Sequence, residues 1–324
     1  MTASTTQTSL DAPQNDVRLL APGDPQRAHA LAMALSGSAA LTTEVRRQID
    51  LLAAAAERQG LSLDTLTATF NESCLIAAAL AIESPGRSAM VQMTLPHDDG
   101  PAHGGARAAL SLLSATASAR GLLLLQALVQ PEDSDLAEVY RSGGFRYLTD
   151  LLYMDVSAAR ERPASRMPAD VVLTTYAPEL HATFLRALED SYVDSLDCPG
   201  LTGLRTTEDV LAGHRATGVF DPQGWYVALR GDEPIGVLLT AELPQRSALE
   251  VVYVGVSHAA RGQGVGNYLM AVAFARCRQR RLTAVTLGVD ATNAPARALY
   301  ARWGYRATHR RRVWIAALKE QFHR

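Results

Sequence analysis

The sequence predicts an α/β fold, a mixed sheet with flanking helices, that occurs twice in one chain. Runs rich in β-branched and aromatic residues alternate with segments of helical period throughout the 324 residues. A glycine-rich turn joins one strand of the second half to the helix that follows it. The residue pattern of the first half also returns in the second half. These observations favour two copies of one domain over a solenoid, whose repeats are shorter.

A constant offset of 160 residues aligns the two halves without a gap. It brings tyrosine, glycine and arginine of one half opposite the same or similar residues of the other. The pairs are Tyr140 with Tyr300, Gly144 with Gly304, Phe145 with Tyr305, Arg146 with Arg306, Val129 with Val289 and Gly104 with Gly264. We therefore expect one domain over residues 16–157 and a second over 169–324, which form a pseudo-dimer within the chain.

Strand-like runs and capped helical segments define the first half. The helix expected after Thr42 or Thr43 has a good N-cap, and Gly60 ends it. The expected elements are a strand at 17–21, helices at 26–35 and 42–58, strands at 65–70, 75–83 and 89–95, a helix at 105–119, a strand at 122–129, a helix at 135–141 and a strand at 146–156.

The second half repeats this order after a linker, residues 158–168, that is rich in Ala, Arg and Pro. A hairpin turn is expected at Gly231-Asp-Glu-Pro. The expected elements are a strand at 171–175, helices at 178–190 and 207–217, strands at 225–230, 235–241 and 249–256, a helix at 267–280, a strand and its exit at 287–293, a helix at 293–300 and a strand at 306–317.

Composition and charge exclude several classes of protein. A hydrophobic content of 48% and a charged content of 20% are typical of a globular protein with a substantial core. The net charge of −2 argues against general nucleic-acid binding. The apolar runs are too short to span a bilayer. Residues 1–15 are polar and lack an apolar signal core, so we expect a disordered leader.

The three cysteines, Cys74, Cys198 and Cys277, lie far apart in the sequence. Their odd number does not indicate a disulfide framework, and neither they nor the histidines have the spacing of metal ligands. We therefore expect a protein of the reducing cytoplasm that holds no metal.

The glycine-rich turn follows the strand at 249–256. Gly262, Gly264 and Gly266 allow the backbone to approach a ligand, so that N–H groups can converge on an anion at the positive end of the next helix. A tight turn without a ligand would have the same composition. No Gly-Lys-Ser/Thr follows, which excludes a Walker loop, and the third glycine comes one residue too early for a dinucleotide fingerprint.

What remains is the pattern Arg-x-x-Gly-x-Gly, at Arg261, Gly264 and Gly266. It resembles the coenzyme A pyrophosphate loop of the GNAT superfamily of N-acetyltransferases. Residues 293–300, with Gly304 and Tyr305, look like the next helix and turn of that family. Two motifs in the right order are more specific than either alone. The chain thus resembles a tandem GNAT protein, of the type of mycothiol synthase.

The resemblance implies that acetyl-CoA is the co-substrate. It implies that the backbone at 254–256 pairs with the pantetheine arm, that Asn293 hydrogen-bonds the same arm, and that the glycine loop holds the pyrophosphate. The implied cofactor-binding residues are Val254, Gly255, Val256, Arg261, Gly262, Gln263, Gly264, Val265, Gly266, Asn293 and Ala296.

The first half lacks parts of this loop. The offset of 160 places Pro101 opposite Arg261 and Ala106 opposite Gly266, and Asp98 and Asp99 precede them where the pyrophosphate would lie. Since proline brings neither a donor nor a charge, we expect this half to have lost productive cofactor binding. The segment 104–106 stays a candidate for a bare backbone nest.

Acyl transfer from a thioester to an amine needs a base for the amine proton and an acid for the thiolate. Glu250 is the candidate base, because its apolar neighbours desolvate it and raise its pKa. Period two places it on one face with Val252 and Val254. Its position resembles that of the base in enzymes of the mycothiol synthase type. The alternative is an ordinary solvent-facing strand residue.

Tyr300 is the candidate acid. It lies where GNAT enzymes commonly carry the tyrosine that protonates the coenzyme A thiolate, as the resemblance implies. The alternative is a core aromatic residue, a role that Tyr140 serves at the equivalent position of the first half.

The resemblance places acceptor specificity in the first two helices of the domain and their connection, here residues 191–205. Asp194 and Asp197, beside Tyr192, suit a cationic amine, and Arg205 suits a carboxylate or phosphate. A solvated helix-capping loop would have the same composition. The segment differs from its counterpart in mycothiol synthase.

We therefore expect an acetyl-CoA-dependent N-acetyltransferase that acts on the amine of a small molecule by direct transfer in the second half. Neither a nucleic acid nor a membrane is expected as a partner. The alternatives are a non-catalytic acyl-CoA-binding regulatory protein, transfer of a different acyl group, and transfer to a protein amine.

Overall fold

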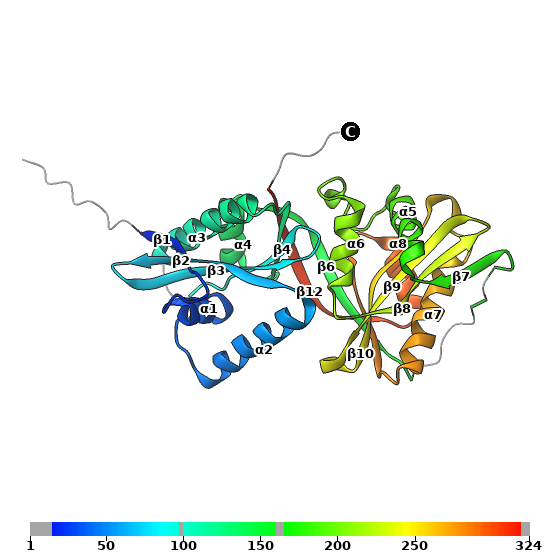
Figure 1. Ribbon diagram of the computed structural model, residues 1–324, viewed down its shortest axis with the longest axis horizontal. Coiled ribbons are helices and arrows are strands. Elements are labelled where there is room, and N and C mark those ends of the chain that lie inside the picture. The colour runs from blue at the N-terminus through cyan, green and yellow to red at the C-terminus, as the bar shows by residue number, and fades with distance from the viewer. Residues whose placement is uncertain (1–14, 97–99, 160–164, 167, 319–324) are drawn as a thin grey trace, which may run out of the picture.

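The computed structural model describes residues 15–96, 100–159, 165–166 and 168–318 (Figure 1). The expected leader, apart from its last residue, and most of the expected linker lie outside these residues. So do Asp98 and Asp99. The described chain forms a mixed α/β structure, which confirms the predicted fold class.

The first half begins with a short edge strand and ends with a long central one. Its elements are β1 (Asp16–Leu19), α1 (Arg27–Ser36), α2 (Thr43–Gln59), β2 (Ser62–Asn71), β3 (Cys74–Ser84), β4 (Ser88–Gln92), α3 (Gly100–Ala119), β5 (Leu124–Val129), α4 (Ser134–Ser142) and β6 (Arg146–Ser157). The side chain of Thr42 caps α2 by accepting from the Val45 amide, and Gly60 ends it in the left-handed conformation.

The second half has the same order of elements. They are β7 (Val171–Thr175), α5 (His181–Tyr192), α6 (Thr207–Arg215), β8 (Val219–Arg230), β9 (Glu233–Leu243), β10 (Ala248–Val256), α7 (Val265–Gln279), β11 (Ala284–Asp290), α8 (Ala294–Arg302) and β12 (Arg306–Ala317). The closing strand has the predicted bounds, and the strand expected at 225–230 starts earlier, at Val219.

The twelve strands of the described residues form one sheet, in the order β1-β2-β3-β4-β5-β12-β6-β11-β10-β9-β8-β7. The last strand of each half has crossed into the other half. Strand β12 pairs with β5, and β6 pairs with β11. Figure 1 shows these two strands side by side between the halves. Each half therefore depends on the other to complete its part of the sheet.

The exchange has local two-fold symmetry. In the antiparallel pair of β6 with β12, Arg306 lies opposite Asp155 and Arg146 lies opposite Ile315. These two crossings are equivalent under the offset of 160 residues. The two copies of the repeat thus exchange their last strands, as two subunits do in a domain-swapped dimer.

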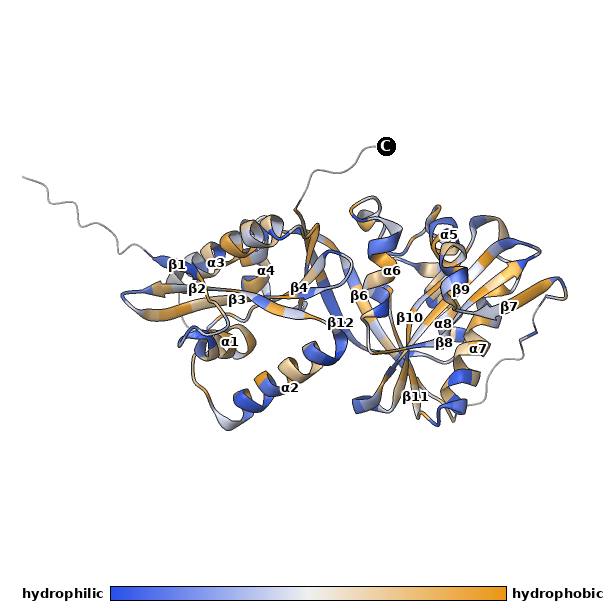
Figure 2. Cartoon of the chain, in the orientation of Figure 1, coloured by the Kyte–Doolittle hydropathy of each residue, from blue (hydrophilic) through white to orange (hydrophobic). Residues whose placement is uncertain are grey.

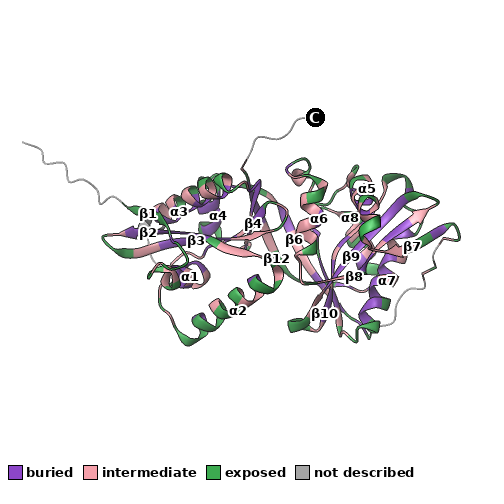
Figure 3. Ribbon diagram, viewed as in Figure 1, coloured by how far each residue is buried: buried purple, intermediate pink, exposed green. Residues whose placement is uncertain are grey.

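The hydrophobic cores follow the same exchange. Trp314 of β12 is buried in the core that α3 and α4 make with β3 to β5. Met154 and Val156 of β6 are buried in the core under α7 and α8. Figure 2 shows the hydrophobic residues along the strands of each half, and Figure 3 shows that the buried residues follow them. No helix among the described residues combines the length and hydrophobicity needed to cross a bilayer.

Candidate active site

The glycine loop joins β10 to α7 as predicted. Gly262 and Gly264 have φ values of 78° and 87°, which residues with a Cβ rarely adopt. Gly264 is the N-cap of α7 and offers no side chain to its first amides. The N-terminal N–H groups of an α-helix lack partners within the helix, and its dipole favours negative charge there. The backbone of the loop therefore has the conformation that suits an anion at the start of a fifteen-residue helix.

The equivalent segment of the first half has a different conformation. Helix α3 begins at Gly100, so Gly104 and Gly105 lie inside it. The Gly105 carbonyl accepts a hydrogen bond from Thr69 Oγ1 at 2.8 Å, and a Cβ at Gly105 would lie 2.7 Å from Ile76. The segment 104–106 therefore does not form the candidate backbone nest, because it lies within helix α3 and Gly105 lets this helix pack closely on the sheet.

A cavity of about 200 Å³ opens where β10 and β11 separate. The two strands are paired in parallel only from Ala248 to Val251 on β10. Beyond that point, residues 254–256 pair with β9 on one edge, and the cavity lies on their other side. Its lining residues are Ser191, Asp194, Ser195, Leu196, Asp197, Val251, Val252, Tyr253, Val254, Gly255, Val256, Arg261, Gly288, Val289, Asn293, Pro295, Ala296 and Tyr300.

A β-bulge in β10 changes the predicted orientation of its side chains. The register with β9 shifts between Val251 and Tyr253. As a result Val252 packs with the core under α5 and α6, whereas Val254 packs with the core under α7 and α8. The expectation that Glu250, Val252 and Val254 share one face was wrong, because the extra residue of a bulge breaks the period of two.

Glu250 lies next to the cavity rather than in its lining. The neighbouring residue Val251 is the first of β10 to line it. Burial raises the pKa of Glu250 above its usual range, and Arg246 partly opposes this shift. Tyr153 lies on β6 of the first half, and its pKa is raised mainly by burial and next by the charge of Glu250. The predicted desolvated carboxylate is therefore present, at the border between the two halves.

Tyr300 lines the cavity from α8 and is 6% exposed. Burial raises its pKa, and the charge of Asp197 adds to the shift. Its hydroxyl therefore keeps its proton at neutral pH, as an acid must before it donates. Asn293 caps α8 by accepting from the Ala296 amide at 3.2 Å, and both residues also line the cavity.

The side chain of Arg261 is directed at the end of α5. Its guanidinium donates to the carbonyl oxygens of Ser191 at 3.0 Å, Val193 at 2.7 Å and Asp194 at 3.0 Å. It also donates to Val256 at 3.3 Å within the loop. The last carbonyls of a helix lack partners and carry partial negative charge, which explains the attraction. The guanidinium of Arg261, which we expected to face a pyrophosphate, thus binds the backbone at the end of α5.

We call residues 191–206, from the last two residues of α5 to the N-cap of α6, the acceptor segment. Asp194 lies near His258, with 3.3 Å between Oδ2 and Nδ1, and it lines the cavity. Asp197 also lines it; the protein atoms around its carboxyl and the charge of Asp290 raise its pKa. Two of the predicted acceptor residues therefore face the cavity from one loop.

Tyr192 and Arg205 do not line this cavity. The ring of Tyr192 packs against Tyr253 with 5.4 Å between centroids. Arg205 Nη1 donates to the Gly86 carbonyl at 3.3 Å and to Ser88 Oγ at 3.1 Å, both in the first half. Hydrogen bonds to the other half thus hold Arg205, the residue expected to bind a substrate anion, away from this cavity.

Sequence reasoning missed Asp290, at the end of β11. Its buried carboxylate accepts from Thr149 Oγ1 and the Thr292 amide, both at 2.8 Å, and from the Cys198 amide at 3.2 Å. It thus joins β6, the entrance to α8 and the acceptor segment. An aspartate at the end of a buried strand was the available signal. Among the described residues no group of three His, Cys, Asp or Glu side chains could hold a metal ion.

Comparisons with known proteins agree with this geometry. Residues 188–305 match the model of the acetyltransferase (GNAT) family. The mycothiol acetyltransferase of Streptomyces bingchenggensis is 34% identical over 149 residues, 46% of this chain and 47% of that protein. That of Thermomonospora curvata is 31% identical over 205 residues, 63% of this chain and 58% of that protein. The chain therefore matches about half the length of these curated relatives.

Two solved structures have the same fold along nearly the whole chain. A GCN5-related N-acetyltransferase from Sphaerobacter thermophilus is 19% identical, with a TM-score of 0.60 and coverage of 96% of this chain and 98% of that one. A tandem GNAT protein from the clavulanic acid biosynthesis pathway is 16% identical, with a TM-score of 0.54 and coverage of 95% and 100%. The tandem arrangement is therefore shared.

The range matched by the family model begins in α5 and ends after α8, so it spans the glycine loop and both sides of the cavity. This part of the second half is therefore similar to the acetyltransferase (GNAT) family.

Proposed function

We propose that the second half transfers an acetyl group from acetyl-CoA to the amine of a small molecule. The observation that carries the proposal is one continuous path. It starts beside the glycine loop, where Arg261 lines the cavity, follows the edge of β10 at residues 254–256 that lies away from β9, and ends between Tyr300 and the acceptor segment. An anion site, an unpaired strand edge and an acid occur along it in the order in which coenzyme A carries its pyrophosphate, its amide-bearing arm and its sulfur.

The reaction needs a neutral amine at the thioester carbon. The amine nitrogen forms the new C–N bond, the C–S bond breaks, and the amine loses one proton. Glu250 accepts that proton through water, because the residue lies behind Val251 rather than in the cavity lining. Its raised pKa makes it a stronger base than an exposed glutamate. Tyr300 donates its proton to the thiolate that leaves.

The acceptor binds from the side of Asp194 and Asp197. Two carboxylates at the cavity favour a basic amine over an anionic group. The curated relatives carry the name mycothiol acetyltransferase, which favours a small-molecule acceptor over a protein amine. We propose a reducing, cytoplasmic location, because the odd number and wide spacing of the three cysteines do not indicate a disulfide framework. We place the domain boundaries at residues 16–157 and 169–324, with their last strands exchanged.

The test is release of the coenzyme A thiol from acetyl-CoA, followed with the purified full chain and a panel of primary amines. The panel holds an amino sugar, a polyamine, an amino acid and the amine substrate of mycothiol acetyltransferase. We expect turnover with at least one small amine and loss of turnover in Glu250→Gln. Normal acetyl-CoA binding without turnover of any amine would instead identify a non-catalytic acyl-CoA-binding protein.

A further inference from the structure

The acceptor segment is held at both of its ends by other parts of the chain. Arg261 of the glycine loop binds the carbonyl oxygens of Ser191, Val193 and Asp194 at its start. Its later part lies on the first half. The two ends of the acceptor side of the site thus have different supports, one in each half of the chain.

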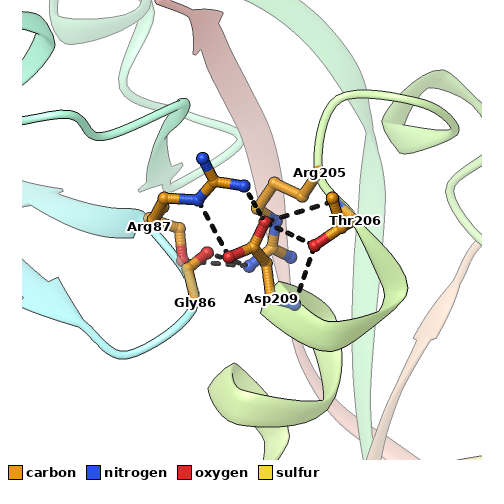
Figure 4. Close-up of polar contacts among 6 residues, drawn as sticks. Gly86, Arg87, Arg205, Thr206 and Asp209 are labelled. Atoms are coloured by element: carbon orange, nitrogen blue, oxygen red, sulfur yellow. Dashed lines mark hydrogen bonds and ion pairs between the residues drawn. The ribbon is translucent and has the colours of Figure 1, made fainter. Parts of the chain in front are cut away.

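The first half supports the acceptor segment at two places, and the first of these is the turn between β3 and β4. Arg87 of this turn makes a two-pronged pair with Asp209 of α6, with 2.9 Å from Nε to Oδ1 and 2.5 Å from Nη2 to Oδ2 (Figure 4). Asp209 also closes a capping box with Thr206, the last residue of the acceptor segment. Arg205 reaches in the opposite direction, to the carbonyl of Gly86. Two-pronged arginine–carboxylate pairs fix orientation as well as distance.

The backbones also meet at this turn. Gly86 has a φ of +86°, and a Cβ there would lie 1.9 Å from the carbonyl oxygen of Asp209. A side chain of any size would therefore push the turn away from α6. The close approach means that the position of α6 follows the position of this turn.

The second place at which the first half supports the acceptor segment is β6, the strand that pairs with β11 of the second half. Arg146 Nη2 donates to the carbonyl of Gly200 at 2.9 Å. A Cβ at Gly200 would lie 2.6 Å from the side chain of Leu148. Leu201 and Leu204 of the acceptor segment pack in one hydrophobic cluster with residues of β5, β6 and β12.

We propose that the first half is a positioning element for the acceptor site of the second half, and that the Gly86-Arg87 turn is its main contact. This proposal rests on the proposed function, since it assigns the acceptor to the cavity beside residues 194–197. The first half keeps the fold of a cofactor-binding domain, but a helix replaces its glycine loop. Its contribution is instead to fix where Asp194 and Asp197 face the cavity.

The test compares the full-length protein with Arg87→Ala, Gly86→Ala and the matched control Gly121→Ala. Gly121 has a φ of +84°, close to that of Gly86, but nothing lies within 4 Å of a Cβ there. Both glycine variants therefore carry the same backbone strain, and only Gly86→Ala adds the collision with α6. The first readout is amide hydrogen exchange of residues 191–215, which needs no acceptor.

We expect Arg87→Ala and Gly86→Ala to speed exchange in residues 191–215 at least tenfold, with acetyl-CoA affinity within twofold of wild type. Gly121→Ala leaves exchange of these residues unchanged. Equal exchange in all four proteins would overturn the proposal. The hydrogen-exchange readout tests the positioning role even if no amine is turned over, so the two proposals fail separately.

The second readout is steady-state kinetics with the amine that the panel identifies. We expect Arg87→Ala and Gly86→Ala to raise the KM for the amine about tenfold and to leave the KM for acetyl-CoA unchanged. Arg87→Lys, which keeps the charge, restores part of the loss. An equal fall in kcat with unchanged KM values, or an equal effect in Gly121→Ala, would show a general loss of stability and contradict the positioning role.

Discussion

Arg261 donates from Nη2 to the carbonyl oxygen of Val193 at 2.7 Å, so an arginine of the proposed cofactor loop also binds the end of helix α5. The Arg261 guanidinium therefore links the loop to the acceptor segment. The backbone amides of the loop remain available to a pyrophosphate, whereas the side chain of Arg261 is engaged on the acceptor side. This division of roles leads to a prediction that differs from the one made for a phosphate-binding arginine.

Arg261→Ala leaves three carbonyl oxygens at the end of α5 without their charged donor. We expect a loss of about 1.5–3 kcal/mol in the free energy of unfolding, the range of hydrogen bonds to charged groups. We also expect a larger rise in the KM for the amine than in the dissociation constant of acetyl-CoA. A fall in acetyl-CoA affinity alone would show that the guanidinium contacts the cofactor directly.

Glu250→Gln removes the proposed base but keeps the size of the side chain. We expect kcat to fall about a hundredfold or more, as for loss of a general base, while calorimetry shows unchanged acetyl-CoA binding. In the wild type, activity is lost as pH falls through the raised pKa of Glu250, because the protonated carboxyl cannot accept a proton. A variant with the same pH profile and the same kcat would exclude this role.

Tyr300→Phe has a matched control in the repeat, Tyr140→Phe. We expect about a hundredfold lower kcat for Tyr300→Phe, since the thiolate loses its acid. Tyr140 is buried, and its hydroxyl donates to the Val91 carbonyl at 3.3 Å. Its replacement lowers stability by about 1 kcal/mol and leaves turnover unchanged. Equal turnover in Tyr300→Phe and the wild type would assign Tyr300 to the core instead.

His214 gives a prediction for acid stability. Its ring stacks on Tyr253, with 5.6 Å between centroids, and its buried Nε2 has no hydrogen-bond partner among the described residues. Burial lowers the pKa of His214 to about 4, from an ordinary value of 6.5. Below pH 6.5 the unfolded chain therefore binds a proton that the folded chain refuses, and stability falls as pH falls. The loss reaches about 3 kcal/mol at pH 4.

Urea unfolding of the wild type and His214→Phe at pH 7, 6, 5 and 4 measures this loss. The phenylalanine variant lacks the titrating group but keeps an aromatic ring. We expect its free energy of unfolding to fall less steeply with pH than that of the wild type. Parallel curves for the two proteins would show that His214 is protonated inside the fold.

Much of the architecture was accessible from local patterns. Strand β12 has the predicted bounds, and α2 has the predicted cap and end, because hydrophobic period and capping act over a few residues. The glycine loop was also predictable. Its glycines are required by backbone conformations that other residues rarely adopt, so the requirement is visible in the sequence.

Long-range features were not predictable from one sequence. The alternation of apolar and polar residues in β12 would be the same whether it paired within its own half or with β5 of the other half. The residues of β12 therefore do not indicate the strand exchange. A bulge adds one residue to a strand without changing its composition, which hid the orientation of Val254. Arg205 and Arg261 have the residue type of anion ligands, but nearby carbonyl oxygens compete for the same donors.

The central claim is that one acetyl-CoA binds per chain, at the loop before α7. Calorimetric titration of the full chain tests it most directly, beside Gly264→Ala and Gly121→Ala. The two glycines have φ values of +87° and +84°, and nothing lies within 4 Å of a Cβ at either position, so the strain is matched. We predict one site per chain, at least tenfold weaker in Gly264→Ala and unchanged in Gly121→Ala. Two sites per chain, or equal affinity in Gly264→Ala, would contradict the account.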